Sequence, residues 1–138
     1  MRIVRSLRLG AFVLGACASG AMSAVAAEAR LEGAWIQGGE GCAEVFSRSG
    51  KALSFKKPVN AFAPAFIISG NQIRTPQASC RIKGAKRSGD RRILALACAT
   101  SVAVDEVPAT LEPVADGTLR RYLNDNDTVG SKYERCSL

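Results

Sequence analysis

The chain contains no histidine among its 138 residues. Histidine is the commonest general base and the proton carrier of Ser-His-Asp and Cys-His sites, so those nucleophilic arrangements are excluded. The His-Glu zinc motifs are excluded for the same reason. A phosphate-binding glycine loop is also missing, because Gly38-Gly39-Glu40-Gly41 is not followed by lysine and Ser/Thr. We therefore expect no enzyme activity, no catalytic residues and no cofactor.

Paired carboxylates are the remaining route to catalysis, since two of them can hydrolyse a glycosidic bond. The candidates are Asp105-Glu106 and Asp125 with Asp127, and both pairs are expected in loops. The segment 124–130 also begins like a calcium loop. It has Val129 where an oxygen ligand is needed, and a cysteine where the loop needs its glutamate. We expect a polar turn there and no metal site.

No apolar run is long enough for a convincing membrane-spanning helix. The first eight residues contain three arginines and no acid, and a short apolar run from Leu9 to Ala16 follows them. Small residues then continue to Ala27. These are the three parts of a secretory signal. We predict a signal peptide over residues 1–27 and one exported domain over 28–138, in the periplasm or secreted.

A second sorting signal lies within the first. Leu14-Gly15-Ala16-Cys17 resembles the lipobox of bacterial lipoproteins, in which the cysteine is lipidated. Cys17 is therefore a candidate for lipidation, which would anchor the protein to a membrane. The residues after Cys17 stay small and apolar, which favours ordinary cleavage near Ala26 or Ala27.

The cysteines form an even set once the signal is removed. The four that remain are Cys42, Cys80, Cys98 and Cys136. In an oxidising compartment they predict two disulfides, and the lack of a Cys-x-x-Cys pair disfavours zinc. Three pairings are open. A hairpin turning at Ser88-Gly89-Asp90 would place Cys80 opposite Cys98, at a separation that a disulfide spans, and would leave Cys42 for Cys136.

The formal charge is moderate, because removal of the three signal arginines lowers it from +7 to +4. An exported protein of this charge is not expected to bind nucleic acid. Six basic residues surround the same hairpin tip, with only Asp90 among them: Arg81, Lys83, Lys86, Arg87, Arg91 and Arg92. They indicate either a solvated tip whose charges prevent association between strand edges, or a contact for an anionic partner. Lipid headgroups, lipopolysaccharide and acidic proteins are such partners.

Short β-favouring runs recur about every ten residues after the signal, separated by turn residues. Across the predicted Gly70-Asn71 turn, Phe66 and Ile68 share a face with Ile73. No long segment has a helical period. The expected strands are 31–37, 42–47, 52–56, 65–69, 72–75, 80–83, 94–98, 110–114, 119–123 and 131–136. The pattern predicts an all-β domain, a small antiparallel barrel or sandwich of about eight strands with two disulfides.

The segment 58–64 is expected to be a connector, because its two prolines break strand pairing. The run 61–68 is the most apolar part of the exported domain and is expected in the core. Phe62 lies between the prolines and is the candidate apolar contact for a partner.

Gly33-Ala34-Trp35 looks like the Gly-x-Trp in the first strand of lipocalin-like (calycin) barrels. The small bacterial periplasmic metalloprotease inhibitors of this superfamily also combine a signal peptide, a short mature domain and a cysteine soon after this motif. Cys42 stands in a similar place. The resemblance implies a barrel in which Trp35 packs across one end, with Gly33 beside it. It implies one disulfide where this chain has cysteines for two, and no residue here matches the inhibitory N-terminal segment.

These features together predict a non-enzymatic binding module of the cell envelope, with inhibition of a protease or lysozyme as its specific form. The alternatives are a barrel that carries a lipid or small apolar ligand, and a structural envelope lipoprotein anchored through Cys17. The expected partner is an unknown protein or an anionic envelope component, with peripheral membrane contact and without nucleic acid. An interior filled by the protein's own side chains would argue against a carrier.

Overall fold

The computed structural model describes residues 30–39 and 41–138. The strands in this part are β1 (Gly33–Ile36), β2 (Phe46–Ser49), β3 (Ala52–Phe55), β4 (Ala65–Ser69), β5 (Gln72–Arg74), β6 (Ser79–Ser88), β7 (Arg91–Ala99), β8 (Val104–Pro113), β9 (Leu119–Tyr122) and β10 (Ser131–Arg135). A short helix, α2 (Cys42–Val45), runs directly into β2. The predicted signal peptide and Cys17 lie outside the described residues. None of the helices within them is long and apolar enough to span a bilayer.

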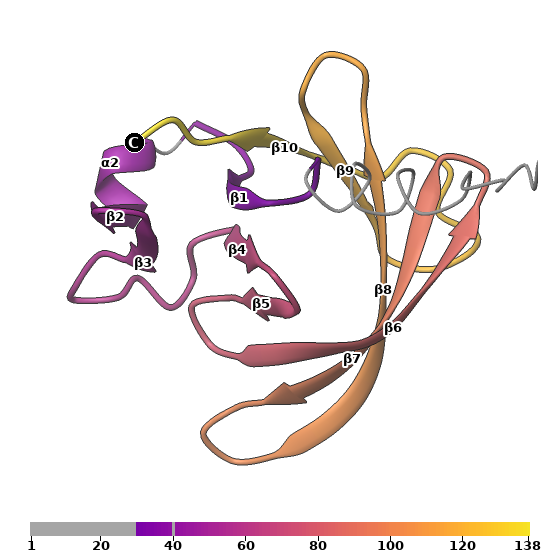
Figure 1. The fold of residues 1–138 in the computed structure, drawn as a ribbon, viewed down its shortest axis with the longest axis horizontal. Helices are drawn as coiled ribbons and strands as arrows, with labels where there is room; N and C mark the ends of the chain where they lie inside the picture. Colours follow the sequence, from indigo (N-terminus) through magenta and orange to yellow (C-terminus); the bar gives the residue numbers. More distant parts are fainter. Residues whose placement is uncertain (1–29, 40) are drawn as a thin grey trace, which may run out of the picture.

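Eight of the strands form a closed antiparallel barrel (Figure 1). Its order is β1-β10-β9-β8-β7-β6-β5-β4, so strands β4 to β10 each lie beside their neighbours in sequence, and β1 closes the barrel between β10 and β4. This is an up-and-down arrangement. The hairpin of β2 and β3 is a separate sheet inserted between β1 and β4. The predicted all-β barrel is confirmed, and its architecture is compatible with a lipocalin-like barrel.

The interior of the barrel is filled by its own side chains. Trp35 is 1% exposed, and its indole Nε1 donates to the carbonyl oxygen of Leu31 at 2.8 Å. The rings of Phe66 and Tyr133 pack with their centroids 4.8 Å apart. The buried members of this interior cluster are Leu31, Trp35, Phe66, Ile68, Ile73, Cys80, Leu94, Leu96, Leu111, Leu119 and Tyr133. An eight-stranded barrel is just wide enough for such filling.

Strands β1 and β4 are buried on both faces. In β4, Phe66 and Ile68 face the barrel interior, whereas Ile67 is 0% exposed in a second cluster outside the barrel. Burial on both faces explains why this strand is a continuous apolar run and does not alternate. The second cluster packs α2 and β2 against β1 and β4. Its buried members are Ala34, Ile36, Val45, Phe46, Ala63, Ala65, Ile67 and Cys136. We call residues 42–64, which cover this cluster, the lobe.

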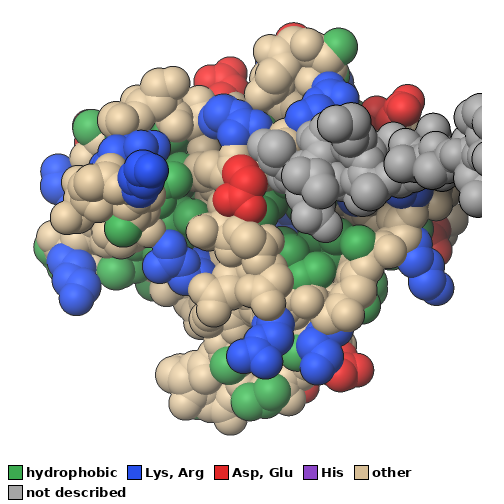
Figure 2. All heavy atoms as spheres, viewed as in Figure 1, with side chains coloured by type: hydrophobic (Ala, Val, Ile, Leu, Met, Phe, Trp, Pro, Cys, Tyr) green, Lys and Arg blue, Asp and Glu red, His purple; other side chains and the backbone are tan. Residues whose placement is uncertain are grey.

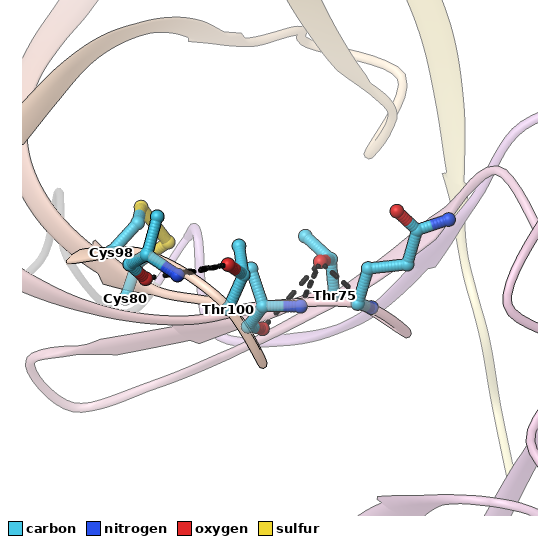
Figure 3. Close-up of a disulfide and its surroundings, with 7 residues drawn as sticks. Thr75, Cys80, Cys98 and Thr100 are labelled. Carbon is cyan, nitrogen blue, oxygen red and sulfur yellow. Dashed lines mark hydrogen bonds between the residues drawn. A yellow bond between two sulfur atoms is a disulfide. The ribbon is translucent and has the colours of Figure 1, made fainter. Parts of the chain in front are cut away.

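Two disulfides join the cysteines in the pairing that the hairpin geometry favoured, Cys42–Cys136 and Cys80–Cys98. Cys80 and Cys98 are directly opposed on β6 and β7 (Figure 3). The strand expected over 42–47 was partly wrong, because Cys42 lies in helix α2. Cys136 follows β10, so the Cys42–Cys136 bond fastens the lobe to the last strand of the barrel. Its partners are 94 residues apart, and closing so long a loop restricts the unfolded chain strongly.

The β6–β7 hairpin is longer than predicted and contains a bulge. Ile82 pairs with Leu96 as expected, but the next pair is Gly84 with Ala95, so Lys83 is an extra residue on β6. The extra residue shifts the rest of the hairpin, and Ser88 lies opposite Arg91. Beyond the bulge, the two faces of β6 are therefore exchanged relative to the prediction.

Candidate functional site

The six basic residues predicted to surround one tip are divided between the two faces of the sheet. Leu94 and Leu111 belong to the interior cluster, and Arg92 lies two residues from Leu94 and directly opposite Leu111. Because side chains alternate along a strand, Arg92 is on the inner face, as is its cross-strand partner Arg87. Lys86 pairs with Ile93 and Arg91 with Ser88, both on the outer face. Arg81 pairs with Ala97 beside the disulfide, and Lys83 is at the bulge.

Arg91 is engaged within the fold. Its guanidinium carbon lies 3.6 Å from the ring centroid of Tyr122, and its Nη2 donates to the carbonyl oxygen of Asp127 at 3.3 Å. The Tyr122 hydroxyl donates to the Glu112 carboxylate. That hydrogen bond, together with burial, raises the pKa of Tyr122. Arg91 therefore holds the loop between β9 and β10 against the outer face of the barrel.

The loop that resembled a calcium site is organised by Asp127. One carboxylate oxygen accepts from the N–H groups of Gly130 at 2.9 Å and Val129 at 3.2 Å, and the other accepts from Leu123 N–H at 3.0 Å. The hydrogen bonds from Gly130 and Leu123 are the main causes that lower the pKa of Asp127. The carboxylate shapes a polar turn, as is common for Asp in loops. Over residues 30–39 and 41–138, no group of three His, Cys, Asp or Glu side chains could hold a metal ion.

Asp105 and Glu106 lie on strand β8, although the sequence suggested a loop. Adjacent residues of a strand point to opposite faces, so this pair does not flank a common bond as glycoside hydrolysis requires. Residues 104–109 of β8 pair with β7, whereas the pairing of β8 with β9 covers 110–113. The two acids and Pro108 therefore line a free strand edge, where charge and proline discourage association with another strand.

Phe62 is the most exposed aromatic side chain in the described part of the chain, at 89%. The backbone around it is held in place. The Asn60 side-chain oxygen accepts the Phe62 N–H at 3.0 Å, and the Asn60 carbonyl accepts the Ala63 N–H at 3.2 Å. Gln77, from the turn between β5 and β6, donates through Nε2 to the Ala61 carbonyl at 2.7 Å. We call residues 60–63 the Phe62 loop. In this loop the Phe62 ring is exposed, while hydrogen bonds with Asn60 and Gln77 hold the backbone in place.

The lobe that carries this loop is basic. Its described residues 42–64 include one acid, Glu44, and four exposed cationic side chains: Arg48, Lys51, Lys56 and Lys57. Figure 2 shows lysine and arginine side chains around the lobe, on the left of the view. Val59, 42% exposed, adds a smaller apolar group near Phe62 in the sequence. The lobe therefore combines an exposed apolar side chain, Phe62, with positive charge.

Two turns at the opposite end of the barrel from the β6–β7 tip share one hydrogen-bond pattern (Figure 3). Thr75 Oγ1 accepts from the N–H groups two and three residues on, at 3.3 and 3.0 Å, and Thr100 Oγ1 does the same at 3.3 and 3.1 Å. The second turn exposes Val102, which is 91% accessible. Val102 is thus a strongly exposed apolar side chain outside the lobe.

No family model, curated protein or solved structure matches this chain. What the fold defines is the class: an up-and-down barrel of eight antiparallel strands, with two disulfides and a basic lobe on its outside.

Two features of these surfaces were missed by the sequence analysis. Gln77 anchors the Phe62 loop from 16 residues away, and nothing in the local sequence indicated that contact. The inward direction of the Arg92 side chain could have been predicted from the sequence, because alternate residues of a strand share a face and Arg92 lies two residues before Leu94. The inward direction of Arg87 could not, because it depends on the bulge.

Proposed function

We propose that this protein is a non-enzymatic binding module exported to the cell envelope, and that it binds a protein partner through Phe62. The observation that carries the proposal is a phenylalanine 89% exposed on a loop with a fixed backbone. Aromatic side chains that enter apolar pockets are typical hot spots of protein interfaces. A loop already held in its bound shape loses less conformational entropy on binding.

The positive charge of the lobe indicates what kind of surface the partner has. The lobe that carries the Phe62 loop has four exposed lysine and arginine side chains and one acid, so a complementary partner has an apolar pocket in an acidic surface. In its more specific form, the proposal is inhibition: Phe62 would occupy the pocket of an exported protease or lysozyme and block it. The periplasmic location belongs to the same proposal.

A ligand-carrying barrel has less support. A carrier needs an open interior, whereas Trp35, Phe66 and Tyr133 pack in the core of this barrel with eight other buried residues. A structural lipoprotein would depend on Cys17, which lies outside the described residues. The binding module is therefore the function with a specific surface to test.

The test compares Phe62→Ala with Val102→Ala, a matched control that also removes an exposed apolar side chain. The full chain is expressed, purified after export and used to capture partners from an envelope extract, and the affinity for the captured protein is then measured. We expect Phe62→Ala to weaken binding about 30-fold, as for a hot spot of about 2 kcal/mol, and Val102→Ala to change it little.

Both substitutions remove exposed groups, so the stability of each variant should change by less than about 0.5 kcal/mol. Unaltered affinity in Phe62→Ala would contradict the proposal. If the captured protein is a hydrolase, its activity with and without the module tests the inhibitory form.

A further inference from the structure

Two arginines oppose each other on the inner face of the β6–β7 hairpin. Arg87 and Arg92 are direct cross-strand partners. The Cβ atoms of such partners lie about 4.5–5.5 Å apart, and like charges in these positions destabilise a sheet. The bulge at Lys83 creates the pair, because without the extra residue Arg87 would lie opposite Arg91.

Arg92 is buried, with 8% of its surface exposed, between Arg87 and Leu111 on the neighbouring strands. Its Nη1 donates to the backbone carbonyls of Asp90 and Arg91, both at the long distance of 3.4 Å. The salt bridge found among residues 30–39 and 41–138 joins Lys132 to Asp116 and involves neither arginine of the pair. A buried guanidinium whose charge is not matched by a carboxylate is costly.

A third arginine adds to the positive field. Arg30 precedes β1, which runs in the same direction as β7 in the antiparallel barrel, so Arg30 lies at the end of the barrel where β7 begins with Arg91 and Arg92. Its carbonyl oxygen accepts a hydrogen bond from Nη2 of Arg135 at 2.6 Å. Burial and the charges of Arg87 and Arg30 lower the pKa of Arg92, while Asp90 raises it by less. The effect of the two cations therefore outweighs that of Asp90 on Arg92.

Protection of a strand edge accounts for Arg87 but not for Arg92. The pairing of β6 with β5 ends at Arg81, so Arg87 lies on an open edge, where an inward charge discourages association. Arg92 lies on β7 between β6 and β8 and is paired on both sides, so it has no edge to protect. Local conflicts of this kind are expected mainly at functional sites.

We propose that Arg92, Arg87 and Arg30 bind a phosphate group at this end of the barrel. Guanidinium groups match phosphate oxygens with paired hydrogen bonds. A phosphate monoester carries a charge of about −1.5 to −2 at neutral pH, which offsets the repulsion among the three arginines. The β6–β7 tip lies to the right in Figure 1 and the lobe to the left, so this site is separate from Phe62 and does not rest on the proposed function.

The test follows binding of inorganic phosphate to the exported protein by amide chemical shifts and by the melting temperature, with sodium chloride keeping the ionic strength constant. We expect phosphate to raise the melting temperature, as any ligand of the folded state does. Arg92→Gln should weaken phosphate binding about tenfold or more, since it removes charged hydrogen bonds. Lys51→Gln removes the same charge from the exposed β2–β3 turn and should change binding less than about twofold.

Arg87→Gln gives a second variant if Arg92→Gln fails to fold, and its expected loss is of the same kind. Without phosphate, Arg87→Gln should be at least as stable as the wild type, because it relieves the repulsion. The proposal is overturned if phosphate stabilises the protein no more than chloride does. It is equally overturned if Lys51→Gln weakens binding as much as the arginine variants, since the effect would then be general charge attraction.

The source of the phosphate is separated by two further probes, soluble glycerol 3-phosphate and phosphatidylcholine vesicles with and without phosphatidic acid. Binding of glycerol 3-phosphate without binding to the vesicles supports a soluble phosphate ester. Arg92-dependent binding to the phosphatidic acid vesicles as well supports a lipid headgroup. These results do not depend on Phe62. If Phe62→Ala still bound the protein partner, the proposed function would fail and the phosphate site would not be affected.

Discussion

The barrel and the lobe share two strands but differ in their sheets, because the barrel sheet is closed and the lobe sheet is not. Strands β1 and β4 contribute Trp35 and Phe66 to the barrel core, and Ile36 and Ile67 to the lobe core. The barrel sheet closes on itself, whereas the lobe contains a two-stranded hairpin, which is marginal by itself in water. The lobe therefore depends on the barrel for its stability more than the barrel depends on the lobe.

The two disulfides follow the same division. Cys80–Cys98 closes a separation of 18 residues within one paired hairpin of the barrel, and Cys42–Cys136 closes 94 residues and ties the lobe to β10. A stable scaffold thus carries an attached element that displays Phe62. The two proposed sites also lie in different regions. The protein contact is on the lobe, and the phosphate site is on the barrel.

The largest effect is expected from Trp35→Ala, which should unfold both regions together. The substitution leaves a cavity in the barrel core and removes the hydrogen bond to Leu31 and the stacking of Arg135, and it should cost about 3–5 kcal/mol. Urea unfolding followed by far-UV circular dichroism measures this cost, since the chain has no other tryptophan.

Phe46→Ala is the matched change in the lobe core, where Phe46 is 2% exposed. We expect its effect on amide hydrogen exchange to be concentrated in the lobe. Equal loss of protection in lobe and barrel would show that the two are one cooperative unit, and that the lobe is not the less stable region.

Removal of the Cys42–Cys136 bond is the next largest change. Replacing both cysteines by serine should cost about 2–4 kcal/mol and loosen the lobe before the barrel. Hydrogen exchange of the β2–β3 amides measures this loosening, and the Cys80, Cys98 double serine variant is the control within the barrel. Partner binding through Phe62 should weaken in the first variant, while phosphate binding should persist. Loss of phosphate binding there would show that the disulfide also supports the barrel end.

The sequence was sufficient to predict the barrel because most of its signals are local. Turn residues separate the strands, and alternation puts Phe66, Ile68 and Ile73 on one face, where the structure has them. The even number of cysteines and the hairpin geometry together indicated both disulfides. The run 61–68 was expected in the core. Ala63 and residues 65–68 are buried there, whereas Ala61, Phe62 and Pro64 are exposed.

The remaining features depend on contacts that local patterns do not contain. The short helix α2 comprises four residues and is held by the second core and by Cys136, 94 positions away. The bulge at Lys83 adds one residue to β6, and the neighbouring Gly84 is compatible with a bulge but does not fix which residue is the extra one. Since the bulge decides whether Lys86 or Arg87 faces Arg92, the candidate phosphate site could not be predicted as a site, although Arg87 and Arg92 were named as basic contacts and Arg30 was not.

The smallest effect is expected from protonation of Asp127 at low pH. It should change the amide shifts of the loop between β9 and β10 but not those of the lobe. The pKa of Asp127 is lowered by hydrogen bonds from Gly130 and Leu123, so its contribution to stability is present above the ordinary aspartate pKa of about 3.9 and is lost as the pH falls through the lower folded value. The amide shifts of Leu123 and Gly130 should therefore titrate below about pH 4. Asp127→Asn should abolish that titration, whereas Asp125→Asn should leave it. A lobe amide whose shift at low pH is abolished by Asp127→Asn would contradict the separation of the two regions, because the Asp127 carboxylate accepts its hydrogen bonds from Leu123, Val129 and Gly130, outside the lobe.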